Sequence, residues 1–387
     1  MILKSLPISI LAHSKVSIHS HLFAVLISFC TVFTITQAAP NRYAENFTIE
    51  RFETHKVLTV TNLWRGSGDT SHTYVLVPKD SPIPTVNLPA NAQIIRTPVT
   101  RMISMATVYL GHIQELQLHD QLVAVSYLSH TNDPLVRQKV EEGKIKSIPT
   151  GSALDVEALM LLQPDILFTS STGTPAFDVH PQLIRAKLPV VLTSGYMENH
   201  PLARAEWIKF IAAFVNKDEQ AEIIFNKISE RYETLAALTR NLTERPTLFS
   251  NAPYGGKWHL PGGQSYSAQA FADAGGDYLW AKDTSRGGIP LDFERVYYKA
   301  AYADFWLNPS SHLSIKALLQ SDERFAKFNA VREGNVFNNT QRLNPGGGND
   351  IWERGICHPE EVLADLIKVL HPKLLPDHEL IFYQKID

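Results

Sequence analysis

Residues 155–168 read DVEALMLLQPDILF and residues 292–307 read DFERVYYKAAYADFWL, so one pattern occurs twice in the chain. Each copy has Asp-x-Glu, a short apolar stretch of helical character, and then an Asp before a strand-like apolar run. The first Asp of each copy can cap a helix, and Glu157 and Glu294 then lie in the first turn, where the helix dipole favours a carboxylate. The repeat predicts two similar α/β lobes, although ordinary helix capping could produce either copy alone.

The chain has 387 residues, which is enough for about two to three domains. It is 44% hydrophobic and 19% charged, a composition typical of soluble globular proteins. The net charge of −3 shows no basic bias, so we do not expect nucleic acid as a partner.

Segment 1–38 has the features of a secretory signal peptide. Its apolar run LFAVLISF, at residues 22–29, follows two lysines, and residues 36–38 offer a small-residue cleavage site. Cleavage would leave Cys357 as the one cysteine, which predicts no internal disulfide and a buried thiol. The alternatives are an uncleaved membrane anchor and lipidation of Cys30.

Residues 39–98 are expected to form a β-rich N-terminal extension. Three runs in it, FTIERFE, KVLTVTN and TYVLV, are rich in β-branched and aromatic residues and predict a hairpin or small meander. Four prolines between residues 78 and 89 indicate an extended connector.

From Arg101 the pattern changes to alternating strand-like and helical runs, which predicts a parallel or mixed sheet covered by helices. Segment 218–242 has apolar residues at helical spacing and no Gly or Pro, which predicts one helix of roughly 37 Å. The predicted layout is a lobe at 99–217, this linking helix, and a lobe at 243–387, with the cleft between the lobes. The predicted strands are 102–106, 122–126, 166–169, 190–193, 247–250, 305–308 and 335–337, and the predicted helices are 108–116, 156–162, 181–186, 268–274, 313–320 and 359–370.

Seven landmarks follow one another between residues 101 and 371. They are TRMISMATVYLGHIQEL, LVAVSY, DVEALMLLQPDILF, LPVVLT, FADAGGDY, FNAVREGNVF and HPEEVLADLIKVLHP. This ordered set resembles the periplasmic substrate-binding proteins of ABC importers for iron–siderophores, haem and cobalamin. The resemblance implies two Rossmann-like α/β lobes joined by one long α-helix, here with the β-rich extension added.

The resemblance also implies a function. It predicts a periplasmic, monomeric protein with no catalytic residues and no cofactor, which captures a ferric siderophore, haem or cobalamin in the interlobe cleft. The protein would deliver this metal chelate to an ABC importer permease. In that family one exposed Glu in each lobe docks onto arginines of the permease, and the matching positions here are Glu157 and Glu294. Such charge pairs set register and encounter rate more than affinity.

Ligand contacts are expected from loops that follow the strands. Aromatic rings can stack on a chelate, and guanidinium groups can pair with carboxylate or catecholate oxygens. The Gly-rich loop at 341–355 (QRLNPGGGNDIWERG) resembles a loop in a subset of iron-related members. The candidate ligand-binding residues are Tyr127, Tyr196, Tyr254, Trp258, Tyr266, Arg286, Arg342 and Trp352, any of which could instead be a packing residue.

Two other classes of function stay open. A protein that binds zinc or manganese directly would need three or four His, Asp or Glu ligands in the cleft. His130, His200, His259 and His312 lie near loops, but their spacing is not that of a ligand set. A metal-dependent enzyme is the second alternative, although the chain has no GxSxG, GxGxxG, P-loop or HExxH motif.

Overall fold

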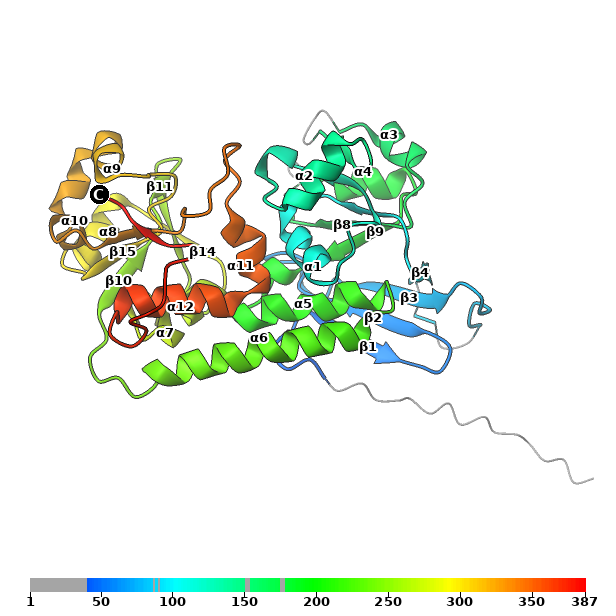
Figure 1. Ribbon diagram of the computed structural model, residues 1–387, viewed down its shortest axis with the longest axis horizontal. Coiled ribbons are helices and arrows are strands. Elements are labelled where there is room, and N and C mark those ends of the chain that lie inside the picture. The colour runs from blue at the N-terminus through cyan, green and yellow to red at the C-terminus, as the bar shows by residue number, and fades with distance from the viewer. Residues whose placement is uncertain (1–39, 86–87, 90, 150–153, 175–177) are drawn as a thin grey trace, which may run out of the picture. The chain divides into compact units, whose positions relative to one another are not determined.

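The computed structural model describes residues 40–387 apart from 86–87, 90, 150–153 and 175–177 (Figure 1). The predicted signal peptide and Cys30 therefore lie outside the described residues. No helix among the residues described is both long enough and apolar enough to span a bilayer.

The β-rich extension forms a four-stranded sheet in the order β1-β2-β3-β4. The predicted meander accounts for three of its strands, and the fourth, which pairs in parallel with β3, was not predicted. The sheet packs on the first lobe, since the ring of Phe47 lies 4.8 Å from that of Trp207 and the hydroxyl of Tyr74 accepts the N–H of Leu192. The strands are β1 Phe47–Arg51, β2 Lys56–Val60, β3 His72–Pro78 and β4 Gln93–Thr97.

The first lobe is built on a parallel sheet in the order β7-β6-β5-β8-β9. Its central strands are almost entirely buried, as expected when helices cover both faces. Helix α2 and strand β7 were not predicted. The elements are β5 Met102–Ser104, α1 Leu110–Glu115, β6 Leu122–Ser126, α2 Pro134–Glu141, β7 Lys146–Ile148, α3 Val156–Leu161, β8 Ile166–Ser170, α4 His180–Arg185 and β9 Val190–Thr193.

Two helices, not one, follow the last strand of the first lobe, β9. Helices α5 (Pro201–Ala213) and α6 (Asp218–Thr239) pack on each other, and α12 (Pro359–Leu370) contacts both (Figure 1). The predicted linking helix corresponds to α6. Helix α5 was missed because nearly all its residues are buried, so it lacks the one-sided apolar pattern of a surface helix. Its start is marked by His200, whose Nδ1 accepts the N–H of Leu202.

The second lobe has a sheet in the order β13-β10-β15-β16-β17, parallel except for the edge strand β17. A small antiparallel sheet in the order β11-β12-β14 is formed by residues between β10 and α8. It was not predicted. The elements are β10 Thr247–Ser250, β11 Pro253–Tyr254, β12 Lys257–Pro261, α7 Tyr266–Asp273, β13 Asp277–Tyr278, β14 Gly288–Leu291, α8 Phe293–Ala300, β15 Phe305–Leu307, α9 Ile315–Ser321, α10 Asn329–Arg332, β16 Val336–Asn338, α11 Arg354–Cys357 and β17 Gln384–Lys385.

The duplicated pattern occupies equivalent places in the two lobes. Strands β8 and β15 each pair with the first strand of their sheet, and a short helix, α3 or α8, precedes each of them. The prediction of two similar α/β lobes is therefore confirmed. The capping prediction holds for Asp155, which accepts the N–H of Ala158 at 2.9 Å. It is wrong for Asp292, whose carboxylate binds Lys257 Nζ at 2.6 Å instead.

Candidate ligand-binding cleft

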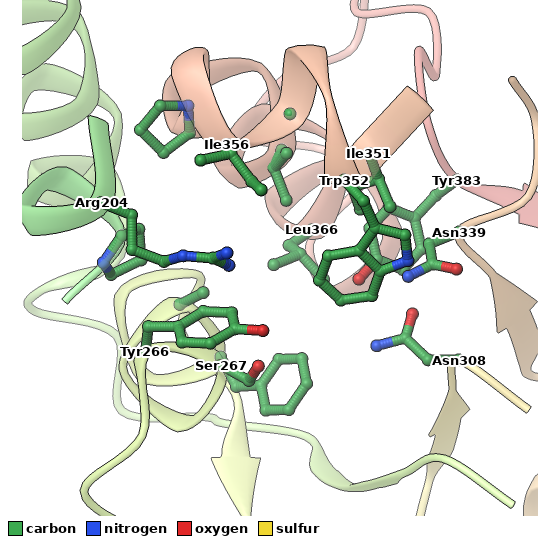
Figure 2. Close-up of a pocket in the computed structure, with 16 residues that line it drawn as sticks. Arg204, Tyr266, Ser267, Asn308, Asn339, Ile351, Trp352, Ile356, Leu366 and Tyr383 are labelled. Carbon is green, nitrogen blue, oxygen red and sulfur yellow. The ribbon is translucent and has the colours of Figure 1, made fainter. Parts of the chain in front are cut away.

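Three adjoining cavities form one cleft. The main cavity, of about 750 Å³, is lined by loops of the second lobe and by Tyr196 of the first. A first-lobe cavity of about 200 Å³ shares Tyr196 with it, and a floor cavity of about 80 Å³ shares Tyr266 with it (Figure 2). Arg204 lines both smaller cavities. The main cavity alone lies in the range of about 300–1,000 Å³ that is usual for small-molecule sites.

Polar residues reach the cleft because they come directly after parallel strands. Asn251 follows β10, Asn308 follows β15 and Asn339 comes just after β16, and all three line the main cavity. The first two have φ angles of 65° and 55°, in the left-handed region that asparagine tolerates better than most residues. The carboxyl ends of the second-lobe strands thus present a row of amides to a ligand.

Large aromatic side chains stand in the main cavity with much of their surface exposed. Tyr254 is 83% exposed and Trp352 is 44% exposed. Tyr196 is oriented by its hydroxyl, which donates to the carbonyl oxygens of Ser171 (2.7 Å) and Leu63 (3.1 Å). Burial raises the pKa of Tyr196 to about 12, so this hydroxyl keeps its proton at neutral pH. Exposed aromatic surface of this kind indicates a binding site for a ligand with apolar or aromatic faces.

Five of the eight candidate ligand-binding residues line the main cavity: Tyr196, Tyr254, Tyr266, Arg286 and Trp352. Their contact with a ligand stays a prediction. The other three, which follow below, line none of the three cavities.

Trp258 is a core residue, and its assignment to the cleft was wrong. It has no exposed surface, and its Nε1–H donates to the carbonyl oxygen of Ser250 at 3.0 Å. The reason is the alternation of strand β12, in which Trp258 and Leu260 point into the core while Lys257 and His259 point outward. Its ring packs against Phe249, Trp306, Phe325 and Phe328.

Tyr127 and Arg342 line none of the three cavities, so their contact with a ligand stays a prediction that the cleft does not support. Tyr127 has a φ of 56° and stacks on His130, with the ring centres 6.1 Å apart. Arg342 donates from Nε to the carboxylate of Asp350, so its charge is already paired. Arg286 does line the main cavity and forms an ion pair of 3.2 Å with Glu45 of the N-terminal extension.

The late loop, residues 341–353, ties the second lobe to the first. The Glu353 carboxylate accepts the backbone N–H groups of Asn132 and Asp133, both at 2.8 Å. Burial raises the pKa of Glu353 to about 7, although these two hydrogen bonds act in the opposite direction. Side chains at Gly346 or Gly348 would overlap backbone carbonyls of the first lobe, which explains why this loop is rich in glycine.

A second link between the lobes centres on His358. Its Nε2 binds Glu115 of α1 at 2.9 Å and its Nδ1 binds Glu360 at 3.0 Å. Burial would lower the pKa of His358, but the two carboxylates raise it to about 9, so the ring is a cation at neutral pH. His358, Glu115 and Glu360, called the His358 node below, form an ion-pair network that holds α1 against the start of α12.

The alternative of a direct metal site depends on converging ligands. Among the described residues, the one group of three such ligand atoms belongs to His358, Glu360 and Glu361, within 4.8 Å of one another. Both ring nitrogens of this histidine are engaged, and Glu361 is held by two hydrogen bonds from Arg354, of 2.9 and 2.6 Å. The four histidines that the sequence suggested do not belong to this group.

The two predicted docking glutamates lie on separate lobes. Glu157 is exposed in the first turn of α3. Glu294 is exposed in the first turn of α8, where Arg324 Nη1 lies 3.5 Å from its carboxylate.

Sequence reasoning missed the residue at the centre of the cleft, Arg204. Its guanidinium group lies over the ring of Tyr266, with Cζ 4.3 Å from the ring centre (Figure 2). The available signal was a lone arginine within the apolar start of helix α5, PLARAEW. Because helix α5 was not predicted, this arginine could not be placed in the cleft from the sequence.

Comparison with known proteins decides the family. The sequence model of the family described as periplasmic binding protein matches residues 103–343. The chain belongs to this family. An uncharacterised lipoprotein of Methanocaldococcus jannaschii is 25% identical over 333 residues, which cover 82% of this chain and 76% of that protein.

Solved structures of other binding proteins share the fold. A periplasmic haem-binding protein from Pseudomonas aeruginosa has a TM-score of 0.56 at 19% identity, covering 75% of this chain and 98% of that one. An ABC transporter substrate-binding protein from Listeria monocytogenes has a TM-score of 0.54 at 16% identity, covering 70% and 99%. The match to the family model confirms that the ordered landmarks are those of a periplasmic binding protein.

Proposed function

We propose that this protein is an exported binding protein that captures an iron chelate in the cleft and delivers it to an ABC importer permease. Ferric siderophores, haem and cobalamin are the candidate ligands. The observation that carries the proposal is the main cavity, where Tyr196, Tyr254, Tyr266 and Trp352 surround a space of about 750 Å³. A large ligand with aromatic or conjugated faces would bury the exposed surface of these rings.

The contacts between the lobes support a binding protein with limited closure. The late loop and the His358 node both connect the lobes, and α5 and α6 pack along each other beneath the cleft. Such a frame favours a cleft that is largely formed before the ligand arrives, and a preformed site loses little conformational entropy on binding.

The proposed role has no chemical step. The ligand binds, the closed complex docks through Glu157 and Glu294, and the ligand passes unchanged to the permease. Because the two glutamates are exposed and lie one on each lobe, they suit a partner with two equivalent halves.

The direct test is a titration of the purified protein with ferrichrome, ferric enterobactin, haem and cyanocobalamin, followed by absorption and tryptophan fluorescence. The proposal expects saturable one-to-one binding of one of these ligands and recovery of that ligand unchanged. Trp352→Ala should weaken binding at least tenfold, because the indole is a large part of the aromatic lining. The matched control is Tyr302→Ala, which removes an aromatic ring that is 84% exposed outside the cleft.

Two results would contradict the proposal. One is no binding of any of the four ligands by protein whose circular dichroism shows that it is folded. The other is tight binding of zinc or manganese without binding of a chelate, which would favour the direct-metal alternative.

A further inference from the structure

Arg204 lies in the first turn of α5, at the point where the floor cavity and the first-lobe cavity meet. Figure 2 shows its guanidinium group directed into the floor cavity above Tyr266. The ring centre is 4.3 Å from Cζ, which is the geometry of a cation–π contact. Its chain neighbours Ala203 and Ala205 are buried, so the helix holds this side chain at the cleft floor.

This arginine lacks an anion. Its Nε is buried without a hydrogen-bond partner, and no carboxylate in the described part of the chain forms an ion pair with it. The neighbouring arginines differ, since Arg286 pairs with Glu45 and Arg354 pairs with Glu361. Arg204 as a whole is half-buried, but a guanidinium nitrogen without access to water is unfavourable unless a hydrogen-bond acceptor compensates it. At the cleft floor, the charge of Arg204 is therefore not balanced by any carboxylate of the described residues.

The titratable groups beside Arg204 do not supply that charge. Burial lowers the pKa of His112 to about 3, so this ring is neutral at physiological pH. Burial raises the pKa of the Cys357 thiol well above its usual value, and its Sγ lies 3.2 Å from His112 Nδ1. The carboxylates that act on these two groups, Glu115 and Glu353, are engaged in the contacts between the lobes described above. Among the residues that the structure describes, none therefore provides Arg204 with an anion.

A second unsatisfied group lies in the floor cavity. Asn308 Oδ1 is buried and has no hydrogen-bond partner among the residues described. Figure 2 shows this amide across the cavity from Arg204, near Asn339 and Trp352. The cavity thus has a cationic guanidinium group on one wall and a neutral amide on the other, and the nitrogen of that amide donates to Ser250 Oγ at 3.3 Å.

We infer that Arg204 binds one carboxylate group of the ligand at the floor of the cleft. The two Nη groups at the end of its guanidinium can donate two parallel hydrogen bonds to the two oxygens of a carboxylate. The first-lobe cavity beside it is lined largely by apolar groups such as Val108, Trp207 and Ile211, which suit a hydrocarbon body next to that group. A single guanidinium group beside apolar walls balances one negative charge, so the site suits a monoanion better than a phosphate. The inference rests on the proposed function, and it narrows the ligand to chelates that carry a free carboxylate.

Titration with benzoate tests whether Arg204 binds a carboxylate, independently of whether the protein binds a chelate. Side-chain Nε–H signals of the ¹⁵N-labelled full-length protein would be recorded during titration with benzoate, and the Arg204 signal would be assigned from its loss in Arg204→Met. We expect a saturable shift of that signal with a Kd on the order of millimolar, as befits a ligand of so few atoms. Benzamide, which has the same size and no charge, should cause no saturable shift. No shift with benzoate, or an equal shift with benzamide, would overturn the inference.

Variants test whether Arg204 binds an anion or only supports the fold. Arg204→Lys keeps the charge but cannot form the two parallel bonds, so benzoate affinity should fall about tenfold, and Arg204→Met should abolish binding. Both should unfold at a temperature close to that of the wild type, because no ion pair is lost. Arg185→Met, at an exposed arginine of α4, is the matched control and should bind benzoate normally. Unchanged benzoate binding in Arg204→Met would refute the site.

Failure of this inference is distinguishable from failure of the proposed function. If benzoate binds through Arg204 but none of the four chelates binds, the carboxylate site stands and the proposed function fails. If one chelate binds equally well to wild type and Arg204→Met, the proposed function stands and the carboxylate site fails.

Discussion

Asp304 accepts two hydrogen bonds from Thr247, one from its backbone N–H at 2.8 Å and one from its hydroxyl at 2.7 Å. Asp165 accepts the same pair of bonds from Thr100, at 2.7 and 2.9 Å. Each threonine stands at or just before the first strand of its lobe, and each aspartate just before the strand that pairs with it. The duplicated sequence pattern therefore corresponds to a duplicated pair of Thr–Asp hydrogen bonds between two neighbouring strands. We call each such pair a clasp.

Loss of this clasp should destabilise the second lobe. Asp304→Ala removes both hydrogen bonds to a charged acceptor, and we expect the free energy of unfolding to fall by about 1–2 kcal/mol because the site is exposed. Urea denaturation measures the change. Asp80→Ala, at an exposed aspartate after β3, should have no effect. Equal stability of Asp304→Ala and the control would show that the clasp contributes nothing.

The late loop should control how the lobes move. Glu353→Ala leaves the backbone N–H groups of Asn132 and Asp133 without their acceptor, so these two amides should exchange with solvent at least tenfold faster. Amide hydrogen exchange followed by NMR measures this. Glu333→Ala, at an exposed glutamate before β16, is the control. Unchanged exchange at both amides would mean that the loop does not restrain the first lobe.

The His358 node gives stability a dependence on alkaline pH. Below pH 6.5 the ring is protonated in both the folded and the unfolded chain, and its ion pairs contribute in full. Between pH 6.5 and about 9 only the folded chain keeps the proton, so this contribution falls as pH rises. At about 1.4 kcal/mol per pKa unit, the shift corresponds to about 3 kcal/mol.

Thermal unfolding of wild type and His358→Gln from pH 6 to 10 tests this dependence. The wild type should be the more stable at pH 6, and the difference should shrink towards pH 9. His312→Gln is the control, because burial lowers the pKa of His312 and it titrates below this window. A difference that stays constant across the window would refute the assignment of a charged His358.

The docking glutamates should act in transport and not in capture. The double variant Glu157→Ala with Glu294→Ala should reduce uptake of the bound ligand by cells at least tenfold, while its Kd for the ligand stays the same. The control removes an exposed glutamate from another helix of the first lobe and one from the second, with Glu141→Ala and Glu333→Ala. Uptake equal to that of the wild type would remove the proposed role of the two residues.

Local pattern was enough to predict most of the fold. Strands β6, β9 and β10 have the predicted bounds. A short β-branched or apolar run between turn residues predicts a strand from the local sequence alone. Helix α5 was missed for the opposite reason. It is buried on almost all sides, and its apolar residues show no period that distinguishes it from a strand.

The site was less predictable, because its residues depend on contacts between distant segments. Trp258 reads as a loop aromatic beside YGGK, but the alternation of β12 turns it into the core. Arg342 reads as a free cation, yet Asp350 pairs with it across the late loop. Arg204 becomes notable only when the structure shows that its Nε has no hydrogen-bond partner among the described residues, which a sequence cannot show.

Helix α5 lines the two smaller cavities of the cleft but not the main cavity, and residues in these places differ in how freely they can be replaced. Tyr254, at the rim of the main cavity, is exposed, so its replacement destabilises the fold little and can redirect ligand preference. The floor residue Arg204 belongs to a helix whose next turns, at Trp207 and Phe210, are core. A shift of α5 that adapted the floor to a new ligand would also disturb that core. Divergence among relatives should therefore accumulate at the rim, while the floor keeps its chemistry.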